Sequence, residues 1–126
     1  MEELNIISGH IVDAAYRIHS KLGPGMNESV YESILVRDLR RIGYQVERQK
    51  WISFEFEGMV FRNVCRADII VQNAVIVEVK SVAILSPVFS KQLLTYLRLL
   101  EHRLGLLLNF GAPLMKDGIK RVINGY

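Results

Sequence analysis

Two short apolar segments, separated by only three residues, limit the possible folds of this chain more than any other feature. Residues 67–71 and 75–80 are rich in Val and Ile, and each has the length of a β-strand. Between them lies Gln72-Asn73-Ala74, in which Asn73 tolerates the left-handed backbone that tight loops need. The chain therefore predicts two neighbouring antiparallel strands joined by a short loop.

Three ionisable residues, Asp68, Glu78 and Lys80, lie inside these otherwise apolar segments. Because strand side chains alternate, Glu78 and Lys80 point to the same face of the sheet. A two-residue turn would place Asp68 and Glu78 on opposite faces. A three-residue loop instead pairs Val71 with Val75 and places Asp68 directly opposite Glu78. We predict the three-residue register, or an equivalent bulge.

Such a group suits phosphate chemistry. Two carboxylates one strand spacing apart form a hard-oxygen site suited to Mg²⁺ or Mn²⁺. A metal ion held there neutralises a phosphate, stabilises the leaving oxygen and activates bound water. A nearby lysine orients that water and stabilises the transition state. The plainer alternative is a structural ion pair, in which Lys80 neutralises Glu78 or Asp68 at a sheet edge.

The rest of the chain alternates between helical and strand patterns. Apolar residues at helical spacing predict a helix over residues 7–22, which the breaker Gly23-Pro24-Gly25 ends. Ser86-Pro87 predicts the start of a later helix, because it combines a cap with a proline at the first helical position. The remaining expected elements are a helix over residues 27–42, strands over 51–57 and 59–61 around Gly58, a strand over 105–110 that follows the 86–102 helix, a loop over 113–118 and a final strand over 119–123. This order predicts an α/β fold with a mixed β-sheet flanked by helices: helix, helix, three antiparallel strands, crossover helix, strand and short final strand.

Length and composition fit a single domain over residues 1–126. Half of the residues are hydrophobic, so one core can hold the chain together without disulfides or a structural metal. The lone cysteine, Cys65, cannot form an internal bridge, which is typical of a reducing compartment. The first residues lack the basic and apolar regions of a signal peptide, and no apolar run reaches the ~20 residues needed to cross a bilayer. The expectation is a cytoplasmic protein without a membrane segment.

The formal net charge of +3 excludes little by itself. Basic residues gather in two groups, and each group admits two interpretations: a phosphate-binding surface, or solvated faces of helices and strands. The first group is Arg37, Arg40, Arg41, Arg48 and Lys50, and the second is Lys116, Lys120 and Arg121. Other chemistries are excluded more firmly. His10 and His19 lie on opposite faces of one helix, a single cysteine cannot build a zinc site, and no nucleotide-binding glycine loop or serine-nucleophile motif is present.

The motifs of the chain resemble, in order, those of the GxxExxY family. Residues 22–31 contain Gly25, Glu28 and Tyr31 at the spacing of the family signature. Further segments that resemble the family are Arg66-Ala67-Asp68, Val77-Glu78-Val79-Lys80, Gln92-Leu93-Leu94-Thr95-Tyr96 and Leu108-Asn109-Phe110-Gly111. The similarity covers nearly the whole chain, and the family is grouped with the PD-(D/E)XK nuclease-like proteins. It therefore implies a restriction-endonuclease-like core, in which a helix, three strands, a helix and a strand surround a metal site.

The resemblance also implies roles for individual residues. Asp68 and Glu78 would bind the metal ion, Mg²⁺ with Mn²⁺ as a substitute, and the backbone carbonyl of Val79 would complete the shell. Lys80 would be the catalytic lysine. The other implied site residues are Glu28 as an additional acid, Gln92 and Tyr96 as polar residues of the helix that faces the site, and Gly25 and Tyr31 as structural positions of the motif.

Each helper residue also has a plainer interpretation. Glu28 suits the first turn of any helix, Tyr31 suits a core with a satisfied hydroxyl, and Gly25 suits a turn between helices. Gln92 and Tyr96 could be an ordinary, partly exposed pair.

Two positions depart from the family pattern. Ala67 stands where the superfamily's name has a proline, and Cys65 stands where relatives often have an aromatic residue. We interpret Cys65 as a small buried hydrophobe.

The expected function is a metal-dependent nuclease that hydrolyses phosphodiester bonds of nucleic acid with a metal-activated water. DNA and RNA are equally compatible with the sequence. Two alternatives remain open. One is a catalytically silent nucleic-acid- or protein-binding module that retains the nuclease fold, and the other is a hydrolase of small phosphodiesters or nucleotides. Nuclease relatives commonly act as homodimers, although the sequence shows no clear dimer seam.

Overall fold

The computed structural model describes residues 1–125 and has the α/β architecture that the sequence predicts. Its elements are α1 (Glu2–Leu22), α2 (Glu28–Ile42), β1 (Val46–Phe56), β2 (Met59–Val71), β3 (Val75–Lys80), α3 (Pro87–Leu100), β4 (Leu104–Asn109), the 3-10 helix η1 (Met115–Gly118) and β5 (Ile119–Ile123). No helix within residues 1–125 is long and apolar enough to cross a membrane.

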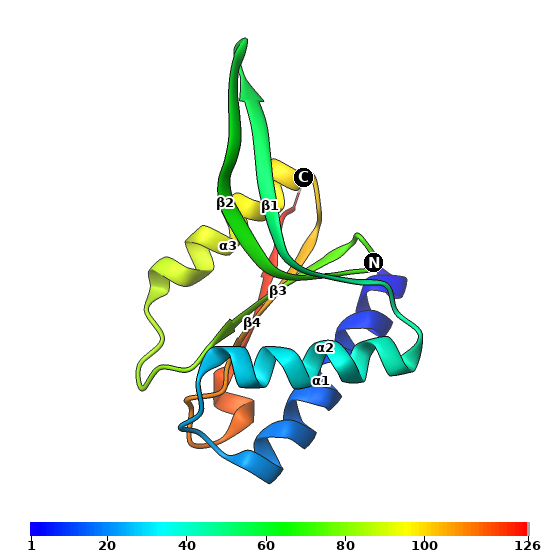
Figure 1. The fold of residues 1–126 in the computed structure, drawn as a ribbon, viewed down its shortest axis with the longest axis vertical. Coiled ribbons are helices and arrows are strands. Elements are labelled where there is room, and N and C mark those ends of the chain that lie inside the picture. The colour runs from blue at the N-terminus through cyan, green and yellow to red at the C-terminus, as the bar shows by residue number, and fades with distance from the viewer. Residues whose placement is uncertain (126) are drawn as a thin grey trace.

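The strands form one mixed sheet in the order β1-β2-β3-β4-β5 over the described residues. Neighbours are antiparallel except β3 and β4, which are parallel and are connected across the sheet by α3. Helices α1 and α2 cover one face of the sheet and α3 covers the other (Figure 1). The predicted three-residue loop is confirmed, because Val71 pairs with Val75.

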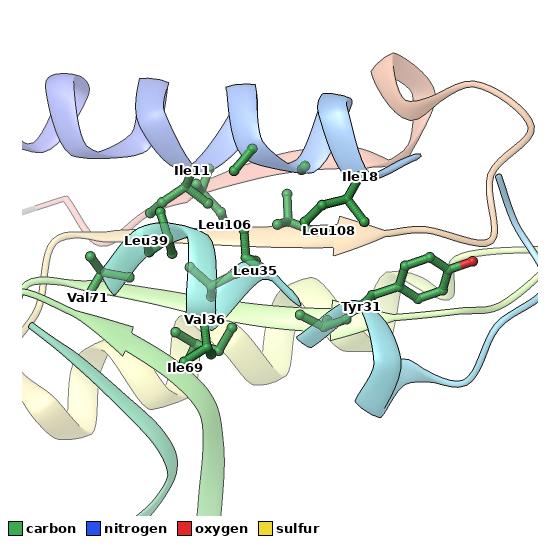
Figure 2. Close-up of a cluster of buried hydrophobic side chains, with 14 of the residues drawn as sticks. Ile11, Ile18, Tyr31, Leu35, Val36, Leu39, Ile69, Val71, Leu106 and Leu108 are labelled. Atoms are coloured by element: carbon green, nitrogen blue, oxygen red, sulfur yellow. The ribbon is translucent and has the colours of Figure 1, made fainter. Parts of the chain in front are cut away.

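The sheet is buried on both faces where the helices cover it. On the α1/α2 side, Ile11, Ile18 and Leu35 pack towards Leu106 and Leu108 of β4 (Figure 2). In β3, the odd-numbered valines belong to this core, whereas Ile76 belongs to the smaller core beneath α3. Since side chains alternate along a strand, the even-numbered Glu78 and Lys80 lie on the α3 side.

The β1–β2 hairpin is long, and its outer part projects beyond the rest of the sheet as an arm (Figure 1). The pairing of its strands skips Gln49, between Arg48 and Lys50, and Gln49 has a left-handed backbone with φ 53°. Ile69 belongs to the α1/α2 core, but Ala67, on the same strand with the same parity, belongs to the α3 core. The strand therefore rotates at Asp68. The paired part of β2 and β3 runs from the loop as far as Ile69 and Val77, so Asp68 lies just outside it.

Several boundaries differ from the predicted ones. The strand predicted over residues 51–57 starts at Val46, and the segments predicted over 59–61 and 67–71 are one continuous strand. Residues 46–50 pair with β2 through their backbones, so the charged side chains at positions 47, 48 and 50 do not prevent strand formation. The predicted 113–118 loop contains η1, α1 begins at Glu2, and α3 ends at Leu100 rather than near His102.

Candidate metal and phosphodiester site

Asp68 and Glu78 face each other where β2 and β3 separate. The backbone N–H of Asp68 donates to Glu78 Oε2 over 2.7 Å, and the N–H of Val79 donates to Asp68 Oδ2 over 2.9 Å. Each carboxylate thus replaces a backbone carbonyl as acceptor just beyond the last strand pair. The register prediction, with both carboxylates on one side, is borne out by these contacts.

Lys80 does not neutralise this pair by direct contact. None of the ion pairs in the described chain includes Lys80. Its Nζ instead lies 4.4 Å from the centroid of the Phe89 ring at the start of α3, a cation–π contact. The alternative in which Lys80 forms a structural ion pair with Glu78 or Asp68 is therefore wrong for this structure.

Glu78 is 5% exposed, and its pKa is strongly raised. Burial, and secondarily the negative charge of Asp68, raise the pKa of Glu78 to about 8, against smaller opposing effects of the Asp68 N–H and Lys80. A buried carboxylate beside another carboxylate is costly unless a proton or a cation accompanies it. Near neutral pH the pair therefore carries a proton that a divalent cation can displace.

The donor set fits a hard divalent cation. Each carboxylate uses one oxygen for a backbone N–H. Of the other two oxygens, Glu78 Oε1 makes no hydrogen bond within residues 1–125, and Asp68 Oδ1 makes only a long contact of 3.5 Å with Gln49 Nε2. The N–H and C=O of one strand residue point to the same side, so the Val79 carbonyl is directed towards Asp68. Within residues 1–125, no group of three or more His, Cys, Asp and Glu side chains is arranged to hold a metal ion. Two carboxylates and a carbonyl are a donor set that a hard divalent cation can use while it keeps several waters.

Glu32 of α2 is a third acid close to the Asp68–Glu78 pair, and the sequence alone did not identify it. It is 5% exposed, and its Oε1 accepts from Gln49 Nε2 over 2.7 Å and lies 3.4 Å from Arg48 Nε. The same Gln49 nitrogen lies 3.5 Å from Asp68 Oδ1, and the charge of Glu32 contributes to the raised pKa of Glu78. Its position in the apolar stripe of the helix, between Tyr31 and Leu35, is the sequence signal that identifies it.

Glu28, the acid implied by the resemblance, lies one helical turn before Glu32 and is exposed. Its Oε2 accepts from the backbone N–H of Ser81 over 3.3 Å. Glu28 therefore sits beside the chain that leaves β3, one residue beyond Lys80, whereas Glu32 is the α2 acid linked to the carboxylate pair.

Gly25 and Tyr31 have clear structural roles in the loop between α1 and α2. Gly25 has φ 114°, a conformation that favours glycine. Tyr31 is fully buried and stacks on Phe110 with 4.4 Å between ring centroids. Its hydroxyl donates to the Gly23 carbonyl over 2.5 Å and accepts from the Met26 N–H over 3.1 Å. The spacing of the motif thus fixes the loop that leads into Glu28.

Tyr96 of α3 is buried near the carboxylates, but Gln92 is exposed. Burial, followed by the charges of Cys65, Glu78 and Asp68, raises the pKa of Tyr96 to about 12. Its phenol therefore stays protonated and can act as a hydrogen-bond donor. The charges of Glu78 and Asp68 act on Tyr96, whereas the exposed Gln92 side chain makes no hydrogen bond to residues 1–125. Cys65 is only partly buried, and burial with the charge of Glu78 raises the pKa of its thiol.

Asn109, at the end of β4, fixes the segment that follows Lys80. Its buried side-chain amide accepts from the N–H groups of Val82 and Gly111, both at 3.0 Å, and donates to the Val82 carbonyl over 2.9 Å. A Cβ at Gly111 would lie 2.4 Å from the Val82 carbonyl oxygen, so only glycine permits this approach. The role of Asn109 was not identified from the sequence.

Many of the clustered basic residues have partners within the protein. The contacts join Arg37 to Asp38, Arg40 to the Val46 carbonyl, Arg48 to Glu32 and Ser33, Lys50 to Glu47, and Arg121 to Asn5 and Ser8. For these residues the structure supports intramolecular roles over a dedicated phosphate-binding surface.

The sequence matches the PD-(D/E)XK nuclease superfamily over residues 5–122. The chain belongs to this superfamily, and its five-stranded mixed sheet flanked by helices, over the described residues, is consistent with a restriction-endonuclease-like core. Nucleases of the superfamily generally use divalent metal ions and act on nucleic acid.

Similarity to individual proteins is limited. No curated protein matches the chain. The solved structure described as the crystal structure of SSO0001 is similar over 92% of this chain and 76% of its own, with 18% sequence identity and a TM-score of 0.42.

Proposed function

We propose that this protein is a divalent-metal-dependent nuclease of the GxxExxY type that hydrolyses phosphodiester bonds in nucleic acid. The observation that carries the proposal is the Asp68–Glu78 pair, in which the partly exposed Asp68 and the buried Glu78 lie side by side. Glu78 accepts the backbone N–H of Asp68, and Asp68 accepts the backbone N–H of Val79. The raised pKa of Glu78 supports it, because a buried acid pair of this kind binds a cation in exchange for a proton.

Asp68, Glu78 and the Val79 carbonyl would hold Mg²⁺, with Mn²⁺ as a substitute. The bound ion would supply charge neutralisation at the phosphate and a more acidic water. Lys80, on the same face of β3, orients the attacking water and stabilises the extra charge on the phosphate oxygens. Its present contact with Phe89 leaves the ammonium free of a carboxylate and available to a phosphate.

The surrounding residues tune this arrangement. Glu32 and Gln49 hold Asp68 from the α2 side, and the protonated Tyr96 offers a donor from the α3 side. Glu28 contributes through the backbone of Ser81, and Gln92, exposed on α3, would reach the site only through bound substrate. We assign the catalytic contact to Lys80 and supporting roles to the others.

One observation favours a second function, a nucleic-acid- or protein-binding module that has kept the fold without catalysis. Arg37, Arg48 and Lys50 of the first basic group pair with acids of the protein itself, so the basic surface that a nuclease would offer its substrate is modest. A protein of this kind would bind nucleic acid in a salt-dependent manner but would not cleave it when a metal ion is added.

Cleavage assays separate the two functions. Purified protein is incubated with single-stranded DNA, double-stranded DNA and RNA in Mg²⁺, Mn²⁺ or EDTA. The nuclease proposal predicts metal-dependent products that disappear in Asp68→Asn and Lys80→Ala but persist in Asp117→Asn, a matched change of an exposed acid on η1. Absence of cleavage by the wild type in every metal and substrate contradicts the proposal, and cleavage by Asp68→Asn indicates a contaminating enzyme.

A further inference from the structure

The projecting arm of the β1–β2 hairpin (Figure 1) carries several exposed apolar side chains, and one of its strands, β2, also carries Asp68. The exposed large hydrophobic residues of the arm are Trp51, Phe56, Met59, Val60 and Val64. Apolar side chains concentrated on one projecting element mark a binding surface more often than scattered ones do. Trp51, the sole tryptophan of the chain, is the one nearest to the carboxylates along the strands.

Trp51 and Arg66 form a pair across the two strands of the arm. They are direct partners in the β1–β2 register, and the Arg66 guanidinium carbon lies 4.9 Å from the centroid of the Trp51 ring. Trp51 is nevertheless 49% exposed. The stacked guanidinium and the indole therefore form a composite planar surface that is open to a ligand.

The charge on this surface is available to an anion. The cations closer to the body of the sheet are occupied, Arg48 by Glu32 and Lys50 by Glu47. Arg62 and Arg66 of β2 take part in none of the ion pairs of residues 1–125. Apart from Glu47, the acids of the hairpin are Glu55 and Glu57, near its tip, and Asp68.

Trp51 and Arg66 also lie close to Asp68 along the two strands of the arm. Arg66 precedes Asp68 by two residues, which is about 7 Å along a strand. Trp51 follows Gln49 by two residues, and Gln49 bonds to Glu32 and lies 3.5 Å from Asp68. These short separations along β1 and β2 leave Trp51 and Arg66 within reach of a nucleic acid whose phosphate lies at the carboxylate pair.

We propose that Trp51 and Arg66 bind an unpaired segment of the nucleic-acid substrate next to the phosphodiester bond at Asp68 and Glu78, an inference that rests on the proposed nuclease function. A base stacks on the indole–guanidinium surface, and the free charge of Arg66 attracts the adjacent phosphate. In a continuous duplex the base faces are already stacked on each other. The arm therefore selects substrates with single-stranded character, such as overhangs, flaps and loops.

Because Trp51 is the only tryptophan, its fluorescence reports binding without a label and without catalysis. The protein is titrated in EDTA with a single-stranded oligonucleotide and with a blunt duplex of the same sequence. The proposal predicts fluorescence quenching by the single strand. In anisotropy measurements with labelled oligonucleotides, Trp51→Ala weakens single-strand binding by roughly ten-fold, whereas Trp51→Phe retains most of it and duplex binding changes little. Arg66→Gln lowers the salt dependence of binding by about one counterion.

Phe56→Ala is the matched control, because Phe56 is an aromatic residue of the same strand that is at least as exposed as Trp51, at 58%, but lies at the far end of the arm. Equal losses for Trp51→Ala and Phe56→Ala overturn the proposal, as does single-strand binding that leaves Trp51 fluorescence unchanged. A fluorescence change that depends on protein concentration, without nucleic acid, assigns the surface to a second copy of the chain and also overturns it.

The outcomes separate this inference from the nuclease proposal. Metal-dependent cleavage of single strands that is unaffected by Trp51→Ala and Arg66→Gln overturns the inference and leaves the nuclease function standing. Trp51-dependent binding without any cleavage supports the surface and contradicts the nuclease.

Discussion

The charge on Glu78 should destabilise the metal-free protein, so removing it with Glu78→Gln should stabilise the fold at high pH. Glutamine has nearly the same shape, and its amide oxygen can still accept the N–H of Asp68 that Glu78 Oε2 accepts over 2.7 Å. The substitution therefore removes the titratable charge while it preserves the hydrogen bond.

The sign and size follow from the pKa of Glu78, which rises from 4.5 to about 8 on folding. Below the lower value both the folded and the unfolded chain carry the proton, and this residue does not penalise folding. Between the two values the unfolded chain loses its proton first, so stability falls as the pH rises, until the folded form is deprotonated as well. The loss amounts to on the order of 3–5 kcal/mol, which is roughly 10–20 °C in Tm for a domain of this size.

Urea unfolding in EDTA at pH values from 5 to 9 measures the effect. We expect the free energies of unfolding of wild type and Glu78→Gln to be similar near pH 5 and to diverge towards pH 9, with the variant more stable. Added Mg²⁺ should stabilise the wild type at pH 9 and leave the variant unchanged. Parallel pH profiles for the two proteins would refute the account of the buried acid pair.

Three further outcomes are expected. Binding of Mg²⁺ to the wild type near pH 7 should release up to one proton, because the cation replaces the proton that Glu78 carries. Calorimetry in two buffers of different ionisation enthalpy measures the number of protons released, and a binding heat that is the same in both buffers argues against proton release. Glu32→Gln should reduce the cleavage rate more than Glu28→Gln, because Glu32 is hydrogen-bonded to Gln49 beside Asp68 whereas Glu28 contacts only the Ser81 backbone. Steady-state cleavage rates of the two variants test this order. The reverse order would make Glu28 the principal acid of α2. Asn109→Ala should destabilise the protein by roughly 2–4 kcal/mol, because it leaves the Val82 and Gly111 backbone groups without their partner. Urea unfolding measures this loss of stability. If the Asn109 side chain acts locally, hydrogen exchange at the Val82 amide should also become faster without global unfolding of the protein.

The carboxylate pair could be predicted from the sequence because its geometry depends only on the number of residues in the loop and on the alternation of side chains along each strand. Strand parity and a three-residue loop are enough to place Asp68 opposite Glu78, and Val71 does pair with Val75. The α/β order was predictable for a similar reason, since Gly23-Pro24-Gly25 and Ser86-Pro87 mark helix ends by backbone chemistry.

The surroundings of the pair depend on three-dimensional packing and were less predictable. Glu28 carries the family motif, yet Glu32 is the buried acid, because helix α2 turns that face towards Gln49 of β1. The amide of Asn109 meets Val82 only after the parallel crossover brings β4 alongside β3. The early start of β1 was hidden because its charged residues pair with β2 through the backbone.

The most direct test of the central claim, that Asp68 and Glu78 hold the divalent ion used for cleavage, is a metal titration of cleavage by wild type and Glu78→Ala. Both proteins are assayed on a mixed panel of single-stranded and double-stranded DNA and RNA over a range of Mg²⁺ and Mn²⁺ concentrations. The account predicts saturable, metal-dependent cleavage by the wild type and none by Glu78→Ala at any metal concentration, with the variant still folded by circular dichroism. Cleavage by Glu78→Ala with an unchanged metal dependence would show that the ion is bound elsewhere and would contradict the account.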